Sequence, residues 1–548
     1  MANLLHQFMR ELMAPRAWFL LLLPLLLLLV RYSVTTNRAR KRQQLDEDVD
    51  NHLPLPPSPP ALPLFGHLHL IGSLPHVSLR NLATKHGSDL MLLRLGAMPV
   101  VVVSSPRAAE AVLRTHDHVF ASRPHSVVAE VVLYGSSDIG FAPYGDHWRK
   151  ARKLVTTHLL TVRRVQSFRH AREEEVSMVM TRIAEAAAAG AAVDVGELLG
   201  SFTNDLACRA VMGKSSGRIR SKLLRELIAD TSPLLGGFNV EEFFPFLARF
   251  GVLSKVVRAK SERLRKRWDE LLDGLIDDHE SMYEMMAAAA AAPASELKDE
   301  DEDFIHILLS VRQEYGLTRE SMKAILLVSS SDLMFSHDVF FGGIDTAASL
   351  LEYTIIELIQ RPHVMKKLQA EVRSSLPQHQ QGRQEIVRED DLHNMAYLRA
   401  VIKESLRLRT VTPLLAPHLS MTQCTIDGLV VPAGVHVLIN VWAIARDARF
   451  WEDAEEFVPE RFLDGGSAAD VGFRGTDFQF LPFSAGRRQC PGINFGMAAV
   501  EVMLANLVHR FDWEMPAGKA ARDIDMSEEF GLVVHRKEKL LLEPKLCA

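Results

Sequence analysis

The chain has 548 residues, of which 47% are hydrophobic and 24% are charged, an ordinary composition for a globular protein with a large core. Its formal net charge is only −5, so no overall positive field draws it to nucleic acid, and we expect no such partner. The four cysteines form no C-x-x-C pair and have no regular spacing, which argues against a disulfide framework or a zinc knuckle and fits a reducing compartment.

The first segment of the chain is too apolar for a globular surface. Residues 17–30 form an apolar run that extends back to Leu12 if Arg16 reaches the bilayer surface, and the longer stretch is about the minimum that spans a bilayer core. Basic residues concentrated in 31–42 favour a cytosolic position for the rest of the chain. A cleaved signal peptide is the alternative, but its basic cluster would precede the apolar run and an A-x-A site would follow it. We therefore expect residues 1–31 to be an uncleaved single-pass anchor.

Residues 32–66 connect this anchor to the rest of the chain. They comprise the basic cluster and the proline-rich stretch "LPLPPSPPALPLFG" (53–66). Because proline fixes φ and favours extended backbone, we expect a stiff spacer that holds a globular body at a set angle to the membrane, with a disordered linker as the alternative. No internal repeat follows, so residues 67–548 are predicted to form one large domain.

The elements of this domain are predicted to be mostly helices. Residues 91–106 indicate a strand, a tight turn and a second, β-branched strand. In 105–116, Ser and Pro occupy the N-cap and first position of a helix, and much of 145–275 has helical spacing. Short strands return in 425–447, where D-G and P-A-G turns separate β-branched runs. The fold class is therefore mainly α with small β-sheets.

Residues 285–303 interrupt the helical pattern. They combine an alanine run, a proline and the five consecutive acids Asp299 to Asp303. Such a charge run is typical of a solvated segment, and helical patterns resume on both sides of it. We expect an exposed connector inside one body and no domain boundary here.

A second interruption lies inside an otherwise continuous helical pattern. The stretch "SMKAILL" (321–327) would continue directly into 338–360 if "VSSSDLMFSH" (328–337) were absent. Consecutive serines weaken a helix interior, and ten extra residues would rotate one half relative to the other by roughly 80° if the helix ran through. Residues 328–337 are thus predicted to be an insertion. It is either an in-frame extension from a misplaced splice boundary or a tolerated bulged loop.

The stretch "FSAGRRQCPG" (483–492) places one cysteine in an unusual setting. A metal-binding cysteine must be ionised, and the charges of Arg487 and Arg488 favour the thiolate of Cys490. Gly486 and Gly492 let the backbone approach a flat ligand without a Cβ clash.

Pro491 favours a helix start directly after the cysteine, and residues 493–511 have the pattern of a partly buried helix. The positive end of that helix would further stabilise a thiolate, such as the one that binds haem iron in some enzymes. A buried structural cysteine is the alternative, but it would not need two glycines and an arginine at these positions.

The pattern F-x-x-G-x-R-x-C-x-G resembles the haem-binding motif of the cytochrome P-450 monooxygenases. It is matched by Phe483, Gly486, Arg488, Cys490 and Gly492. The resemblance implies that Cys490 is the axial ligand of the iron of haem b, iron protoporphyrin IX. It also implies the cytochrome P-450 fold, a single large haem domain behind an N-terminal anchor.

Other motifs of the same family occur elsewhere. "ESLR" resembles the E-x-x-R pair through Glu404 and Arg407, and "PERF" supplies Arg461 as the third member of a structural trio. "WRKAR" resembles the W-x-x-x-R helix, which implies that Trp148 and Arg152 meet a haem propionate.

His418 departs from the family pattern, because many members have an arginine there. By resemblance it would face a propionate, together with Arg488, but a histidine is less reliably a hydrogen-bond donor at neutral pH.

"GGIDT" (342–346) resembles the acid–alcohol motif of the helix above the haem. The resemblance implies that Thr346 donates a hydrogen bond toward dioxygen, that Asp345 relays protons, and that Gly342 and Gly343 thin the helix there. The insertion 328–337 would then lie in this oxygen-binding helix. The motif also favours oxygen activation over the haem-thiolate enzymes that only rearrange hydroperoxides.

The resemblance extends over nearly the whole chain and is finest with plant microsomal members. "FASRP" (120–124) is similar to plant microsomal members in general. "YGSSDIGFAPYGDHWRKARKLVTTHLL" (134–160) and "LLAPHLSMTQCTIDG" (414–428) are similar to the grass enzymes that oxidise indole and indolinones in benzoxazinoid biosynthesis. This implies a single-pass protein of the endoplasmic reticulum membrane with a cytosolic domain. It also implies electrons from NADPH–cytochrome P-450 reductase, since the chain has no flavin or dinucleotide motif of its own.

By the same resemblance, a small hydrophobic or aromatic substrate would contact four parts of the chain. These are Val127–Ile139, Phe341, Val411–Leu415 and Phe530–Leu532. Two other functions remain open at this point. One is a haem-thiolate isomerase or dehydratase that needs no reductase, and the other is an inactive relic in which the insertion blocks haem or oxygen.

Overall fold

The computed structural model describes residues 53–158, 160–213, 218–236, 240–244, 252–289, 303–327, 343–376 and 386–547. The predicted anchor (1–31), the basic half of the spacer and the predicted insertion (328–337) lie outside the described residues. Among the described ranges, no helix is both long and apolar enough to cross a membrane.

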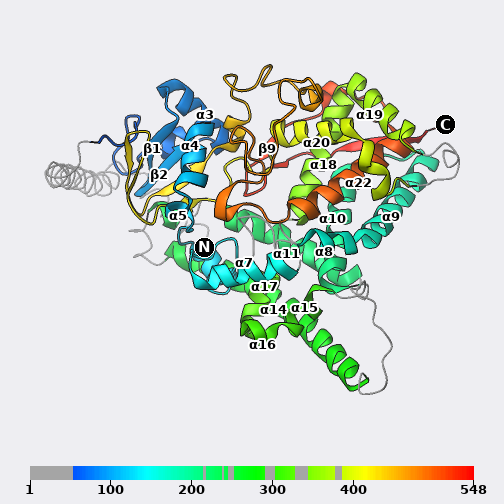
Figure 1. The fold of residues 1–548 in the computed structure, drawn as a ribbon, viewed down its shortest axis with the longest axis horizontal. Coiled ribbons are helices and arrows are strands. Elements are labelled where there is room, and N and C mark those ends of the chain that lie inside the picture. Colours follow the sequence, from blue (N-terminus) through cyan, green and yellow to red (C-terminus); the bar gives the residue numbers. More distant parts are fainter. Residues whose placement is uncertain are drawn as a thin grey trace, which may run out of the picture.

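The main sheet has the strand order β1-β2-β7-β4 and lies on the left in Figure 1. β1 (Leu90–Leu95) and β2 (Met98–Val103) form an antiparallel hairpin, and β7 (His436–Ile439) pairs with β2 in parallel. β4 (His418–Leu419) completes this sheet antiparallel to β7. Smaller sheets are formed by β5 (Cys424–Ile426) with β6 (Leu429–Val431), by β3 (Val193–Asp194) with β11 (Leu541–Leu546) and β8 (Phe511–Glu514), and by β9 (Glu528–Glu529) with β10 (His535–Arg536).

Helices make up most of the described chain. In order they are α3 (Pro75–His86), α4 (Pro106–Glu110), α5 (Asp117–Phe120), α6 (Val127–Val132), α7 (Asp146–His158), α8 (Val162–Ser167), α9 (Arg169–Ala188), α10 (Val195–Met212), α11 (Arg218–Gly236), α12 (Val240–Phe243), α14 (Val252–Ala289), α15 (Phe304–Ser310), α16 (Arg312–Tyr315), α17 (Arg319–Leu327), α18 (Gly343–Gln360), α19 (Pro362–Ser374), α20 (Ala396–Leu408), α21 (Val441–Ile444) and α22 (Ile493–Arg510). Short helical turns include the π-helical η2 (Ala111–Thr115) and the 3-10 turns η1 (Leu68–Leu70), η4 (Glu389–Asn394), η5 (Pro459–Phe462), η6 (Gly486–Arg488) and η7 (Ala521–Asp523).

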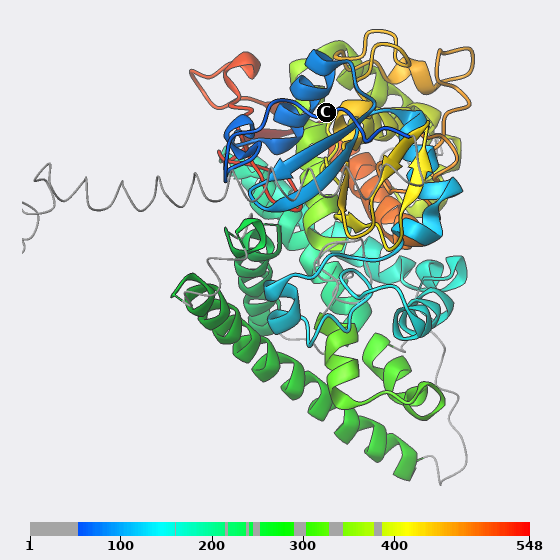
Figure 2. The same ribbon diagram turned by 90° about the vertical axis from the view of Figure 1, so that its left-hand side faces the viewer.

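The helix α18 is at the centre of the helical part of the molecule. It packs against α10, α22 and α20, and its residues Leu351, Ile355 and Ile356 are fully buried. A helix surrounded in this way must be apolar on most of its faces, as "LLEYTIIELI" is. Figures 1 and 2 both place α14–α17 at the bottom of the molecule, below this core and the main sheet.

The structure confirms the elements predicted in 91–106, 105–116, 425–447 and 493–511. At the start of α4, for example, the hydroxyl of Ser105 accepts a hydrogen bond of 3.3 Å from the backbone N–H of Ala108. This is the N-cap that the sequence predicts.

The proline-rich stretch is hydrogen-bonded to the body along part of its length. The backbone N–H of Leu92 donates to Pro57 O at 2.9 Å, and that of Val430 donates to Pro54 O at 2.9 Å. From residue 54 onwards the spacer therefore lies against the edges of two sheets.

The prediction of an exposed connector over 285–303 is wrong at Asp303, its C-terminal end. α14 continues through Ala289 into the alanine run, because alanine is the best helix former. At the other end, Asp303 is only 4% exposed and caps the N-terminus of α15. The carboxylate of Asp303 is paired with His279 and His306, and these contacts could not be predicted from composition.

Candidate active site

The loop that carries Cys490 is pressed tightly against η2. Gly486 in η6 has φ +68°, and a Cβ at this position would lie 2.0 Å from the carbonyl oxygen of Leu113. No other residue type fits there. Cys490 is 2% exposed, its backbone N–H donates to Phe483 O at 2.9 Å, and none of the four cysteines forms a disulfide.

Arg488 is buried beside this loop and is held by backbone carbonyls. Its guanidinium donates to Ala121 O at 2.6 Å, Ile139 O at 2.7 Å and Ala142 O at 2.6 Å, and it stacks on the Trp148 ring at 4.3 Å. Burial lowers the pKa of Arg488 to about 9.

Arg123 is a second buried cation at this site, and the sequence patterns did not select it. It donates to Gly140 O at 3.1 Å, Ala416 O at 3.1 Å and Pro417 O at 2.8 Å. Burial, and then the charge of Arg488, hold its pKa well below the usual range. It belongs to the "FASRP" stretch that carries part of the family resemblance, so a signal was present.

His418 and Asp138 complete this charged region. His418 is 2% exposed and lies 2.8 Å from Phe120 O through Nδ1, and burial keeps its pKa well below the ordinary value. It is therefore neutral and donates from Nδ1. Burial raises the pKa of Asp138 to about 7, even though Phe141 and Ala142 donate backbone N–H groups to it.

Trp148 and Arg152 lie on α7 next to the same loop. The indole N–H of Trp148 donates to Ile139 O at 2.8 Å, and Arg152 lies over its ring at 5.6 Å. Arg152 also donates to Gln489 O at 2.6 Å, one residue before Cys490. The W-x-x-x-R helix is thus joined directly to the cysteine loop.

A narrow cavity separates α18 from the cysteine loop. Thr346 lines one side of it, and Phe483, Gly496 and Met497 line another. Most of the remaining lining is apolar: Ala347, Leu350, Leu406, Val411, Pro482 and Val500, with Thr410 and Thr412 as the hydroxyl-bearing members. Thr346 therefore lines the same cavity as Phe483, whose carbonyl oxygen accepts from the backbone N–H of Cys490.

Asp345 contacts a different partner from its neighbour. Its Oδ2 lies 3.1 Å from His535 Nε2 in β10, and the other ring nitrogen of His535 lies 3.1 Å from the Ser349 hydroxyl. Burial alone would lower the pKa of His535, but the carboxylate of Asp345 raises it overall. Sequence patterns could not indicate His535, because nothing near it in the chain shows that it meets α18.

These residues fit haem b. The narrow cavity between α18 and Phe483 is mostly apolar, and Gly496 presents no side chain to it. Two buried cations, Arg123 and Arg488, lie next to the cysteine loop with one buried carboxyl group, Asp138. The negatively charged propionates would balance the remaining positive charge.

Glu404, Arg407 and Arg461 meet in the core, as their motifs predict. Arg407 donates two hydrogen bonds of 2.8 Å to the Glu404 carboxylate, and Arg461 donates a third of 3.2 Å. Glu404 and Arg407 are fully buried. Arg407 also donates to three carbonyls of 445–456, so the trio fixes the chain leading to η5.

A second cavity, of about 120 Å³, is bordered by the main sheet. Its lining includes Leu414 and Leu415 and all of Phe530–Leu532, which were expected to contact substrate. Val411 lines the narrow cavity instead, so the 411–415 segment runs along both. Val127–Ile139 is absent from the described lining of either cavity, although Ser126 and Phe141 on its two sides border the second, and Phe341 lies outside the described residues.

The family model described as Cytochrome P-450 matches residues 56–542. The chain therefore belongs to the cytochrome P-450 family, and the resemblance found in its sequence is confirmed. Members of this family bind haem b. Because similar relatives are monooxygenases, this protein is a cytochrome P-450 monooxygenase.

Its similarity to particular members extends over the whole domain. The chain is 51% identical to an indole-2-monooxygenase of Zea mays, over 98% of this chain and 96% of that protein. It is 47% identical to an indolin-2-one monooxygenase of Zea mays, over 96% and 95%. A solved structure of a zebrafish cytochrome P-450 with progesterone superposes with a TM-score of 0.68 at 24% identity, over 86% of this chain and 99% of that one, and shows the shared fold.

Proposed function

We propose that this protein hydroxylates a small aromatic compound of the indole or indolinone class. Electrons would come from NADPH through NADPH–cytochrome P-450 reductase. The observation that carries the substrate class is the identity of 51% with an indole-2-monooxygenase along nearly the full chain. The apolar cavity beside the main sheet supports it, because its lining combines leucine, valine and phenylalanine with few polar groups.

The residues of the cysteine loop would hold the cofactor. The thiolate of Cys490 would bind the iron, Gly486 keeps the loop close to η2, and Gly492 would let the backbone approach the haem. Phe483 lines the narrow cavity on the same side. The bound haem supplies the activation of dioxygen.

The propionates would be held by the cations and donors next to the loop. These are Trp148, Arg152, His418 and Arg488, to which the structure adds Arg123. The arginines are charged and have planar donor groups that match a carboxylate. In this structure they donate hydrogen bonds to backbone carbonyls, and the propionates would replace some of these carbonyls as acceptors.

Thr346 and Asp345 would divide the handling of protons between them. Thr346 lines the narrow cavity, and its hydroxyl would donate a hydrogen bond toward dioxygen there. Asp345 Oδ2 lies 3.1 Å from His535 Nε2, close enough for a proton to pass between them, and His535 is 37% exposed at its side chain. Together they form a path from solvent to the cavity.

The substrate cavity offers few groups that could orient a ligand. His436 is one of them, and burial lowers its pKa to about 4, so its ring is neutral. A neutral imidazole can accept a hydrogen bond from an indole N–H.

We also propose that residues 1–31 anchor the protein in the endoplasmic reticulum membrane with the catalytic domain in the cytosol. The support is the apolar run followed by basic residues. A haem-thiolate isomerase is the weaker alternative, because it would not need the acid–alcohol pair at Asp345 and Thr346. An inactive relic is the other, and it depends on residues 328–337.

One pair of proteins tests these proposals. The full chain and a version lacking 328–337 are expressed, reduced and exposed to carbon monoxide, and then supplied with reductase, NADPH and indole or indolin-2-one. A thiolate-type carbon monoxide band and NADPH-dependent hydroxylation by the full chain are expected. A band from the shortened form alone would favour the relic, and product formation without NADPH would favour the isomerase.

A further inference from the structure

A cluster of two histidines and one carboxylate lies between α14 and α15, outside the active site. It consists of His279 on α14, Asp303 at the N-cap of α15, and His306 in the first turn of α15. One ligand atom from each lies within 4.8 Å of the other two. His279 and Asp303 are each 4% exposed, and the ring nitrogens of His306 are buried as well.

The contacts of His279 require a positive charge between its ring and Asp303. Its Nδ1 lies 2.7 Å from Leu275 O, and because a carbonyl oxygen only accepts, Nδ1 must carry the hydrogen. Its Nε2 then faces Asp303 Oδ2 at 3.1 Å with a lone pair against a carboxylate. This contact is attractive only if a proton or a metal ion lies between the two atoms.

His306 gives an independent indication. Its Nδ1 lies 3.0 Å from Asp303 Oδ1, but neither of its ring nitrogens makes a well-oriented hydrogen bond within the described ranges. Nδ1 thus has only this contact with Asp303 and Nε2 has no partner within the described ranges, and buried nitrogens in that state are costly because their hydration is incompletely replaced. A metal ion bound to one of them would remove part of that cost.

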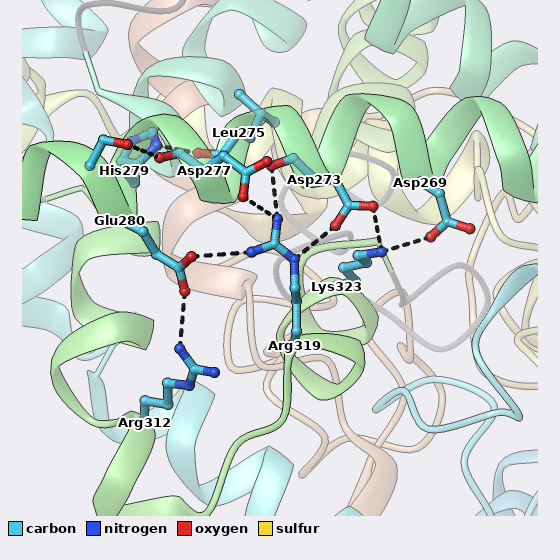
Figure 3. A network of polar contacts seen from close by, with 10 residues as sticks. Asp269, Asp273, Leu275, Asp277, His279, Glu280, Arg312, Arg319 and Lys323 are labelled. Carbon is cyan, nitrogen blue, oxygen red and sulfur yellow. Dashed lines mark hydrogen bonds and ion pairs between the residues drawn. The ribbon is translucent and has the colours of Figure 1, made fainter.

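The nearby acids on α14 are paired differently. Figure 3 shows that Arg319 of α17 reaches Asp273, Asp277 and Glu280. Lys323 joins the same network through Asp273 at 2.7 Å. For Asp303, in contrast, the ion-pair partners found in the described part of the chain are the two histidines. Asp303 therefore differs from the acids on α14, because histidines and not lysine or arginine face its carboxylate, and a bound cation would balance its negative charge.

We propose that His279, Asp303 and His306 bind a single Zn²⁺ ion. Two imidazoles and one carboxylate are a ligand set that zinc prefers, with metal–ligand bonds of about 2.0–2.2 Å. A tetrahedral site with such bonds needs ligand atoms about 3.4 Å apart, and the three ligand atoms here lie within 4.8 Å of one another, so binding would draw them closer together. The bond from Nδ1 of His279 to Leu275 O fixes the tautomer that leaves Nε2 for the metal.

The ion joins the end of α14 to the start of α15. Since it binds the folded arrangement of three side chains from two helices, it stabilises the folded state. Its occupancy is independent of the haem, so the proposal stands whether or not the indole-type activity is found.

The test uses the full chain without a histidine tag, loaded with haem, and measures bound zinc by equilibrium dialysis with elemental analysis. The wild type should bind one Zn²⁺, and X-ray absorption at the zinc edge, which is separate from that of iron, should show imidazole nitrogens. His306→Ala should weaken binding at least about tenfold, as should Asp303→Asn, which keeps a side-chain acceptor at the N-cap. Zinc should raise the midpoint of thermal unfolding of the wild type and not that of His306→Ala.

His170→Ala is the matched control, because His170 is an exposed histidine beside Glu174 on α9. Its zinc binding should equal that of the wild type. Equal binding by His306→Ala and the wild type, or no zinc bound by the wild type, would overturn the proposal. In the second case a proton alone joins His279 to Asp303.

Discussion

The buried charges of this protein are held in two different ways. In the core trio, Glu404 receives hydrogen bonds from both Arg407 and Arg461, so opposite charges are matched. At the cysteine loop, Arg488 and Arg123 are surrounded mainly by backbone carbonyls. Dipoles hold these two cations in place, and the positive charge remains available to a carboxylate-bearing group.

Removing the acid of the trio should unfold much of the protein. Glu404→Ala leaves Arg407 and Arg461 buried without their carboxylate, which costs about 3–5 kcal/mol of unfolding free energy. Urea denaturation followed by circular dichroism measures the loss. Glu514→Ala is the control, since Glu514 is 62% exposed and makes only a 4.0 Å contact with Lys545, so it should cost at most about 1 kcal/mol. Equal losses in both variants would show that the trio does not brace the core.

The contact between His535 and Asp345 should give the protein a dependence on pH. The pKa of His535 is raised in the folded state, so its contribution to stability is complete below the ordinary histidine value and is lost as the pH rises through the raised one. His535→Gln should remove this alkaline loss. It should also lower the yield of hydroxylated product per NADPH consumed, if His535 supplies protons to Asp345. A variant with the wild-type yield and the wild-type pH profile would contradict both expectations.

Among the elements, the cysteine loop depends on how closely it approaches η2. Gly486 lies where a Cβ would be 2.0 Å from Leu113 O, and its φ of +68° disfavours any side chain. The contact is between two backbones, so neither side can yield by changing a rotamer. The loop and η2 therefore hold each other in place.

Gly486→Ala should displace the loop and with it Cys490. The clash and the strained φ together cost about 2–5 kcal/mol, and the variant should retain little haem. The absorbance of haem relative to protein in the purified sample measures this. Gly274→Ala is the control, because a Cβ on Gly274 within α14 would have no neighbour closer than 4 Å, and its haem content should be normal. Full haem loading in Gly486→Ala would show that the loop can move away from η2 without cost.

For the molecule as a whole, substrate binding should depend on the cavity beside the main sheet. Phe530→Ala enlarges this cavity, so an indole-sized substrate should bind less well, with KM raised about 10-fold or more and kcat changed less. Phe450→Ala removes a ring that is 51% exposed elsewhere and should leave KM unchanged. Steady-state kinetics with indole measures both, and an unchanged KM in Phe530→Ala would place the substrate elsewhere.

The sequence predicted those parts of the site that are local in the chain. The strand–turn–strand of 91–106, the helix after Cys490 and the trio motifs could be found because short patterns define them. His535 could not be placed, because its partner Ser349 lies 186 residues away in the chain, and Arg123, although part of "FASRP", could not be paired with Ala416, 293 residues away. Asp303 was expected to be exposed, because a run of acids is usually solvated, whereas here it meets His279 from the preceding helix.

The position of Glu404 and Arg407, two members of the trio, shortly before residues 411–415 has a consequence for how substrate range can evolve. α20 ends at Leu408, one residue after the fully buried Arg407, so the backbone of the next few residues begins from a fixed point. Side chains at 411–415 then line both cavities without supporting the trio themselves. Selection can exchange these side chains one at a time while the scaffold stays constant. Relatives that share about half of their residues with this chain can in this way diverge in preferred compound without losing the fold.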